Sequence, residues 1–428
     1  MKLSSSVAVG FFLATIVSAQ VPAELPQQLT PAQQKIAAAQ KAIESAPERY
    51  QSYNQMAVAL ERRARETGDV SLYAQAEEAL NKSLQLSAAN LEAQKVKASL
   101  LLGEHCYEQA LELASSVNKL WPDDVLIYGY IADAQMALGN YAAAEEATQW
   151  MLNLRPGNIP AMRRTAGMRE VYGDLDGAAE MLTNELIQTA PNESADRAYV
   201  LTRLAHLQLA VGHVTEAEKY LQQARRAFPN LPYTLETLAE LRRAQGNYHE
   251  AAQVLNQLYL MIPAPGNSYK LAVALERENR REYAQSLFQE FERKALEKVH
   301  APDNANLDLV FFYADHARKP QEALRIAKIQ FSRLQNVYAR DAYAWALAVN
   351  GQTAEARKRI DAALAIGVRD PRLFYHAGAI AAQEHDSTAA AAYFKASLDV
   401  NPLSEFAAMA RQALEKLPAT SAIVASAN

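Results

Sequence analysis

The sequence predicts an all-α solenoid of about ten helix pairs, closed at each end by a capping helix. Three columns of residues predict it: an alanine that recurs along the 428-residue chain at a modal spacing of 34, a small residue twelve positions before it, and a proline twelve positions after it. The composition agrees with helices, because only 15 glycines are present and the abundant alanine loses no side-chain entropy in a helix.

The first column is the alanine that follows a short turn entering a helix. Residues 139–144 (GNYAAA) recur as residues 246–251 (GNYHEA), and shorter forms of the same turn occur elsewhere. These anchor alanines are Ala76, Ala110, Ala144, Ala178, Ala217, Ala251, Ala284, Ala323, Ala356 and Ala390. The steps between them are 34, 34, 34, 39, 34, 33, 39, 33 and 34 residues. A period of 34 is that of a helix-turn-helix repeat.

The other two columns keep the same register. Twelve residues before the anchor stand Ala98, Ala132, Ala166, Ala205, Ala239, Ala272, Ala344 and Gly378. A larger side chain there would force the paired helices apart and lose their dispersion contacts. Twelve residues after the anchor stand Pro122, Pro156, Pro229, Pro263 and Pro402, with Pro191 one position later. Proline cannot continue a helix, so it ends the second helix of a pair.

Taken together, the small residue, the Gly-x-Tyr turn, the anchor alanine and the closing proline resemble the tetratricopeptide repeat (TPR) family over about residues 49–402. The resemblance implies a right-handed superhelix in which the first helices of the pairs line a concave surface. It also implies that a peptide or helix of a partner protein binds along that surface. The family's Lys and Asn clamp for a peptide carboxylate is not reproduced here, so recognition of a chaperone C-terminus is not implied.

Three places depart from the regular pattern. In the first unit the turn at residues 66–70 is long, which leaves both Ala57 and Ala64 open as the small residue. In the eighth unit Phe311 occupies the small-residue column after a lengthened connection, so we expect that unit to be distorted or shifted in register. Residues 190–194 lengthen the step between units four and five, and we expect them to bulge outward.

Both ends of the array have the features of caps, which keep a terminal repeat from exposing an apolar face. Thr30 and Pro31 begin a helix that ends before Pro47, and residues 403–416 form a closing helix. We therefore expect a linker at 20–30, the solenoid at 31–416 and a disordered tail at 417–428.

The N-terminus has the pattern of a secretory signal peptide over residues 1–19. Lys2 precedes an apolar run at residues 7–17, and Val-Ser-Ala at 17–19 is a small-residue cleavage site. A membrane anchor needs about 20 apolar residues, so we expect export without membrane insertion after cleavage, to the periplasm of a bacterium or otherwise outside the cell. The single cysteine, Cys106, excludes an intramolecular disulfide, and we expect it to be buried and inert.

Charge and motifs argue against several function classes. The net charge is -5, from 43 basic and 48 acidic residues without a basic block, which argues against a nucleic-acid partner. Residues 249–253 (HEAAQ) begin like a zinc-protease helix but lack its second histidine. Phosphate-cradling, dinucleotide and nucleophile-elbow motifs are also missing from the sequence. We expect no enzymatic activity, no metal and no cofactor.

Candidate binding residues follow from the repeat register. With the anchor as repeat position twenty, positions five, six, nine and twelve of each first helix face inward. The predicted partner-binding residues are Tyr130, Asp133, Arg163, Arg164, Arg203, His206, Glu236, Glu240, Asp341 and Trp345. We expect Arg163, Arg164 and Arg203 to engage carboxylates of an extended partner segment, because guanidinium forks pair well with them. The alternative is that these charges serve solvation and pairing between repeats.

The function favoured by the sequence is an exported scaffold that binds a partner protein along its concave surface. The alternatives are an exported small-molecule sensor or carrier, which requires an apolar pocket, and an enzyme with an unrecognised site. Self-association remains open.

Overall fold

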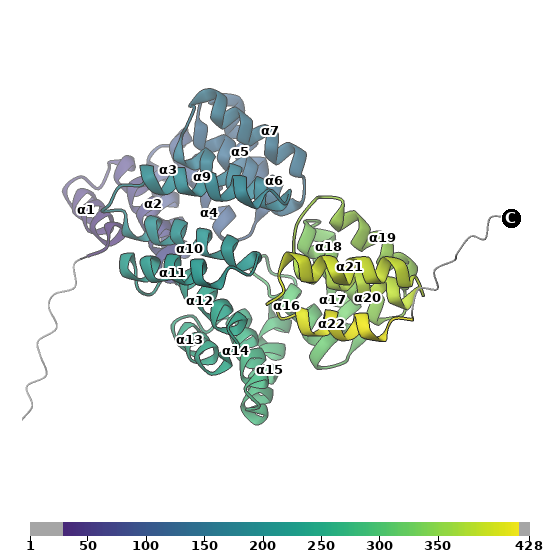
Figure 1. The fold of residues 1–428 in the computed structure, drawn as a ribbon. Helices are drawn as coiled ribbons and strands as arrows, with labels where there is room; N and C mark the ends of the chain where they lie inside the picture. The colour runs from purple at the N-terminus through teal and green to yellow at the C-terminus, as the bar shows by residue number, and fades with distance from the viewer. Residues whose placement is uncertain (1–28, 419–428) are drawn as a thin grey trace, which may run out of the picture.

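The computed structural model describes residues 29–418, and all regular structure in this range is helical (Figure 1). A capping helix, α1 (Pro31–Ser45), precedes ten pairs and α22 (Ala407–Lys416) follows them. The pairs are α2 (Tyr50–Thr67) with α3 (Ser71–Leu86), α4 (Leu91–Gly103) with α5 (Tyr107–Leu120), α6 (Val125–Leu138) with α7 (Tyr141–Leu154), α8 (Ile159–Val171) with α9 (Leu175–Gln188), α10 (Ser194–Ala210) with α11 (Val214–Ala227), α12 (Pro232–Ala244) with α13 (Tyr248–Met261), α14 (Pro265–Arg277) with α15 (Arg281–Glu297), α16 (Asn306–Phe311) and the π-helical turn η1 (Phe312–His316) with α17 (Pro320–Arg333), α18 (Val337–Val349) with α19 (Thr353–Leu364), and α20 (Pro371–Gln383) with α21 (Ser387–Val400). The predicted all-α solenoid is confirmed.

The two alanine columns form the contact between the helices of each pair. All ten anchor alanines are at most 2% exposed. The small residues twelve positions earlier are buried as well, from Ala98 to Gly378. In the first unit both open candidates, Ala57 and Ala64, are buried, and Ala64 is the one that stands twelve positions before its anchor.

A leucine in place of Ala166 is expected to lower the free energy of unfolding by about 1–3 kcal/mol, because Ala166 is fully buried between α8 and α9 and the extra methyl groups would force the helices apart. Ala142, exposed on α7, provides the matched control, and Ala142→Leu should change stability by less than about 0.5 kcal/mol. Urea unfolding of both variants measures the difference; equal losses would contradict the close-packed interface.

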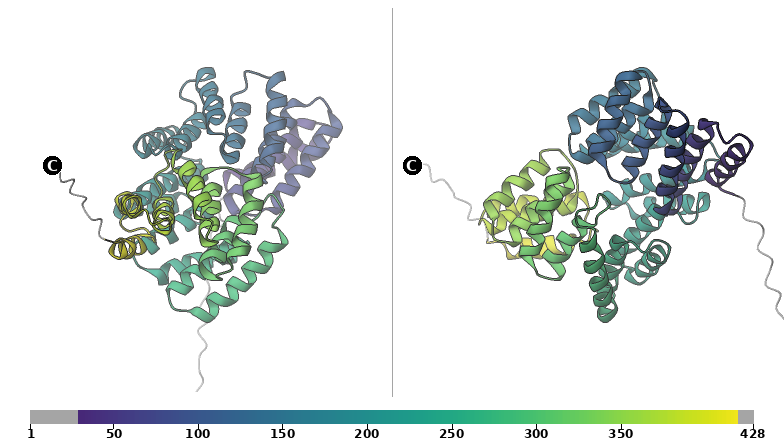
Figure 2. Two further views of the ribbon diagram at one scale, coloured as in Figure 1. Left: turned by 90° about the vertical axis from the view of Figure 1, so that its right-hand side faces the viewer. Right: turned by 180° about the vertical axis from the view of Figure 1, so that it is seen from behind.

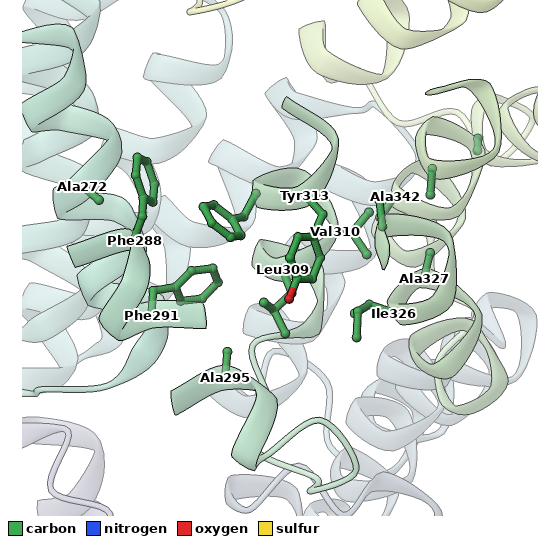
Figure 3. Close-up of a cluster of buried hydrophobic side chains, with 14 of the residues drawn as sticks. Ala272, Phe288, Phe291, Ala295, Leu309, Val310, Tyr313, Ile326, Ala327 and Ala342 are labelled. Carbon is green, nitrogen blue, oxygen red and sulfur yellow. The ribbon is translucent and has the colours of Figure 1, made fainter. Parts of the chain in front are cut away.

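The eighth unit is distorted, as its sequence predicts. Its first helix has only six α-helical residues and continues as the π-helical turn η1. Phe312, next to the small-residue column, packs into an aromatic cluster against α15, 5.3 Å from Phe288 and 5.6 Å from Phe291 between ring centroids. Phe311, in the column itself, stacks on His376 with centroids 6.0 Å apart. Figure 3 shows Phe288 and Phe291 of α15 on one side of the cluster and Tyr313 with Leu309 and Val310 on the other.

The inserted residues between units four and five do not bulge outward, and this expectation was wrong. Residues 190–193 form a turn, and α10, which begins at Ser194, is lengthened to 17 residues. Asp196 lies 3.0 Å from Arg62 of α2, and Glu193 pairs with the same guanidinium. The insertion is therefore drawn onto the first unit by two ion pairs.

Three expectations concern residues that lie wholly or partly outside the described range. The signal peptide at 1–19 lies outside the described residues, as do residues 20–28 of the linker and 419–428 of the tail. Within residues 29–418, none of the helices combines the length and apolar character that crossing a membrane requires.

Candidate protein-binding surface

The predicted inward positions link each first helix to the first helix of the next pair. We call the side chains at repeat positions five, six, nine and twelve of the first helices the inner row. It begins in unit one, where Glu61 accepts a hydrogen bond of 2.7 Å from Ser99 of unit two. It ends in unit ten, where His376 meets Asp341 of unit nine. The sequence therefore places polar side chains at the same register on successive helices, where they bridge the units.

The middle of the inner row consists of ion pairs between neighbouring units. Arg164 pairs with Asp133 of unit three and also donates to the carbonyl oxygen of Gly129 at 2.9 Å. Arg203 pairs with Glu170 of unit four. Each arginine thus already has a carboxylate partner within the chain. This is the inter-repeat pairing that the sequence left open as an alternative to partner binding.

Arg163 differs because its partner lies on a second helix. Its Nε donates to Oε1 of Glu185 on α9 at 2.8 Å, and its guanidinium lies 4.8 Å from the ring centroid of Tyr199. Glu185 is 0% exposed, and its other oxygen has no hydrogen-bond partner. A buried carboxylate depends on its counter-charge, so this arginine contributes directly to the stability of unit four.

His206 bridges three units. Its ring nitrogens lie 3.5 Å from Glu170 of unit four and 3.7 Å from Glu240 of unit six. Burial alone would lower the pKa of His206, but the carboxylates of Glu170 and Glu240 outweigh burial and raise it to about 10. The imidazole is therefore charged at neutral pH and joins two carboxylates that would otherwise repel each other.

This bridge predicts a pH-dependent contribution to stability. Because the pKa is near 6.5 in the unfolded chain and about 10 in the folded one, the contribution is complete below pH 6.5 and is lost as pH rises through 10. His206→Gln should therefore lower the melting temperature most below pH 6.5 and have little effect above pH 10. The ring is 37% exposed, so we expect about 1 kcal/mol.

His213→Gln, in an exposed turn of the same unit, controls for the loss of a histidine. Melting curves of both variants between pH 5 and 10.5 provide the measurement. A deficit of the His206 variant that stays constant across this range would contradict the bridge.

At the C-terminal end of the row, Asp341 is buried and pairs within the chain. It is 0% exposed; its Oδ1 lies 2.7 Å from Nδ1 of His376, and its Oδ2 lies 3.0 Å from Nε of Arg372. Burial raises the pKa of Asp341, but the contact with His376 and the ion pair with Arg372 outweigh burial and lower the pKa. Asp341 is thus the centre of a buried ion network.

Trp345 covers this network. Its ring stacks on His376 with centroids 4.3 Å apart, and its Nε1 donates to Asp315 of unit eight at 2.9 Å. The other two predicted residues also contact neighbours: Glu236 pairs with Lys270 of unit seven, and Tyr130 packs beside Ala98 and Ile127. The structure thus links all ten predicted residues to neighbouring side chains, whereas their role in binding stays a prediction.

Several partners in these contacts were not among the predicted residues. The counting rule, applied to units seven and ten, selects Lys270 and His376. Glu185 and Arg372 stand at other repeat positions, and no signal in the sequence marks them as partners of Arg163 and Asp341. Cys106 is partly exposed at the turn before α5, which corrects the expectation that it is buried.

A separate groove of about 1020 Å³ lies at the N-terminal end. It is lined by the start of α1, the end of α2 and the loops that follow units four and five, with Glu66, Phe228 and Met261 among its side chains. Within the described part of the chain, no three His, Cys, Asp or Glu side chains are grouped so as to hold a metal ion.

The paired helices, their 34-residue register and the inner row define a TPR-like α-solenoid. A human IFIT1 dimer with m7Gppp-AAAA has this kind of fold: TM-score 0.50 and 14% identity, over 85% of this chain and 84% of that one. Yeast Tom70 aligns with a TM-score of 0.39 and 14% identity over 84% and 95% of the two chains. The APC/C hetero-tetramer Cut9-Hcn1 aligns with a TM-score of 0.46 and 13% identity over 90% and 81%. No protein-family model and no curated protein matches the chain.

Proposed function

We propose that this chain is an exported scaffold protein that binds a peptide or helix of a partner protein along the inner row. The observation that carries the proposal is that the row continues through the units and keeps accessible charges after internal pairing. Asp133 is 41% exposed, His206 37% and Lys270 36%. Such side chains can accept or donate further hydrogen bonds to a partner.

The internal pairs refine which residues contact the partner. Arg164 and Arg203 are only 16% exposed and already hold carboxylates. A carboxylate of the partner would have to compete with Asp133 or Glu170 for them. The more exposed side chains of the inner row include both acidic and basic groups, and they are better placed for first contact with a partner. We therefore propose a partner segment of mixed charge rather than an acidic one.

A charge exchange tests the inner row without breaking its pairing. In Glu236→Lys/Lys270→Glu the ion pair between units six and seven is retained with its direction reversed. The matched control is Arg293→Glu/Glu297→Arg, which exchanges a pair on α15 whose side chains are 61% and 62% exposed.

Each tagged variant would be purified from the exported fraction of the native host, and its associated proteins identified by mass spectrometry. We expect a stoichiometric partner with the wild type and the α15 control, and at least about a tenfold loss with the inner exchange. Equal recovery of the partner by both exchanged variants would contradict binding along the inner row.

Export is tested separately by N-terminal sequencing of the protein from the same fraction. The proposal predicts that the mature chain begins at Gln20, directly after the small-residue cleavage pattern. A chain that starts at Met1 and stays inside the cell would contradict export and would leave binding along the inner row unaffected.

The N-terminal groove supports a second candidate function, that of an exported small-molecule carrier. A volume of about 1020 Å³ is in the range of ligand sites. A ligand-dependent rise in melting temperature, abolished by Phe228→Ala in the groove and retained by the inner exchange, would favour this candidate over the scaffold.

A further inference from the structure

Units far apart in the sequence contact each other in a regular register. The turn between the two helices of each of the first five units lies against the chain five units further on. We call these five contacts the seam. They bring Gly68 to Ile262, His105 to Pro302, Leu138 to Gln335, Gly173 to Gly367, and Leu209 to Asn401; His105 and Pro302 line one cavity. Figures 1 and 2 show the result: α18 and α21 lie beside the N-terminal units.

The contact of unit three is the most extensive. The backbone N–H of Gln335 donates to the carbonyl oxygen of Leu138 at 3.3 Å, and the Asn336 side chain donates to that of Ala137 at 2.9 Å. The backbone N–H of Val337 donates to the buried hydroxyl of Tyr141 at 2.8 Å. The loop between α17 and α18 is thereby hydrogen-bonded to a turn almost 200 residues earlier.

The contacts of units four and five follow the same plan. At unit four, the backbones of Gly173 and Gly367 approach so closely that a Cβ on Gly173 would lie 2.4 Å from the carbonyl oxygen of Gly367. At unit five, the side chain of Asn401 donates to the carbonyl oxygen of Leu209 at 2.7 Å. One unit beyond the seam, Arg243 pairs with Glu405 at 3.3 Å.

The space around the turn residues differs between the seam and the rest of the solenoid. The turn residue has a positive φ in all ten units, but units two, seven, eight and ten use His105, Asn279, Arg318 and His385 there. The fold therefore tolerates a side chain at this φ. In seam units one, three, four and five the residue is glycine, and an added Cβ would lie within 3.0 Å of the facing chain. Gly246 and Gly351, outside the seam, have nothing within 4 Å.

Unit two shows what a side chain does at this position. His105 is the one turn residue of the seam that is not glycine, and here the facing segments line a partly open cavity of about 110 Å³, with Cys106 and Arg333 among its lining residues. The two segments are therefore less closely packed at the one seam unit whose turn residue has a side chain. This supports the view that close approach, rather than positive φ alone, requires glycine in the other four units.

We propose that the seam is a clasp that holds the superhelix closed and opens without unfolding any repeat. Units of a solenoid obtain their stability from their immediate neighbours, and the seam joins units five apart. Its contacts are made by turns and loops through a few polar hydrogen bonds, which is the kind of contact that opens at low free-energy cost. The inference rests on the fold and is independent of the proposed function.

The clasp also sets how the inner row is reached. The row lies on the first helices, and the seam fixes the turns at their C-terminal ends to the later units. Opening of the seam would release those ends and widen the approach to side chains such as His206. Closed and open forms would then differ in the distance between units one to five and the later units, and both forms would keep the same helices.

Matched glycine variants test the clasp. Gly139→Asn/Gly173→Asn places side chains against the facing backbone, whereas Gly246→Asn/Gly351→Asn makes the same change where space is open. Asparagine is used because it adopts positive φ more readily than other side chains. The two double variants therefore differ in the seam clash and share the backbone change.

Small-angle scattering, circular dichroism and hydrogen exchange would be measured on both. For the seam variant we expect a larger radius of gyration, about tenfold faster amide exchange at Gln335 and Val337, and unchanged helix content. The control should match the wild type in all three. Equal behaviour of the two variants, or loss of helix content together with the seam, would overturn the proposal.

A disulfide provides a second measurement on folded protein. Leu138→Cys/Gln335→Cys, with Cys106→Ser, places thiols on two residues whose backbones are hydrogen-bonded across the seam. Oxidation should cross-link this protein. The same cysteine pair, introduced into the seam variant and oxidised, should return that variant to the wild-type radius of gyration. A folded protein in which the pair fails to cross-link, or cross-links without reducing the radius, would contradict the clasp.

Discussion

Asp341→Ala is expected to lower the free energy of unfolding by about 3–5 kcal/mol, as is typical when one partner of a buried ion network is removed. Asp341 is fully buried and pairs with His376, which is 2% exposed, and with Arg372. The alanine variant leaves the Arg372 guanidinium without this counter-charge and the buried His376 ring without its hydrogen-bond partner. Urea unfolding followed by circular dichroism measures the loss.

The control for this prediction is Asp399→Ala, which removes an exposed carboxylate from α21 of unit ten. Its effect should stay within about 0.5 kcal/mol, as for most surface substitutions. If both variants lose the same small amount, the ion network at Asp341 does not hold these units together.

The second large loss of stability is expected when the buried carboxylate of Glu185 loses its partner, Arg163. Arg163→Met removes the only side chain that pairs with this buried carboxylate among the described residues, and should cost about 3 kcal/mol. The double variant Arg163→Met/Glu185→Leu replaces both charges by apolar groups of similar size. It should recover most of the loss, because replacing a buried pair with well-packed apolar residues is often neutral or stabilising.

The same urea measurement on the single and double variants separates two roles for Arg163. If the single variant is as stable as the wild type, Arg163 does not support Glu185 and is free for a partner, as the sequence suggested. If the double variant stays as unstable as the single one, apolar packing cannot replace the pair at this site.

The repeat architecture could be predicted from sequence because it depends on local pattern. Ala144 and Ala166 stand where two helices cross closely, and this requirement recurs with each pair. The distortion of the eighth unit was also visible, since Phe311 breaks the small-residue column. Such features need only the residue types within one period.

The seam could not be predicted, because it depends on the rise and rotation that accumulate over five units. A small change in either per unit would bring Gln335 opposite a different turn, and no residue pattern within one period encodes that sum. The glycines at 139 and 173 looked like ordinary turn residues, identical in sequence role to those at 246 and 351. The structure alone separates the two groups.

The candidate surface was predictable in its positions and not in its pairing. Counting from the anchor placed Arg164, Arg203 and His206 in the row that bridges successive first helices. Whether an arginine faces a partner or a carboxylate of the next unit depends on side-chain reach between helices, which the register does not specify. Asp341 shows this, since it has the expected position and lies fully buried.

Site-specific photo-cross-linking tests the central claim, binding along the inner row, most directly. A photoreactive residue would replace either Glu240 in the inner row, 37% exposed, or Gln149, exposed on the second helix α7. Each protein would be irradiated in the exported fraction of the native host. The account predicts that the partner is cross-linked from position 240 and not from position 149; cross-linking from position 149 alone would contradict it.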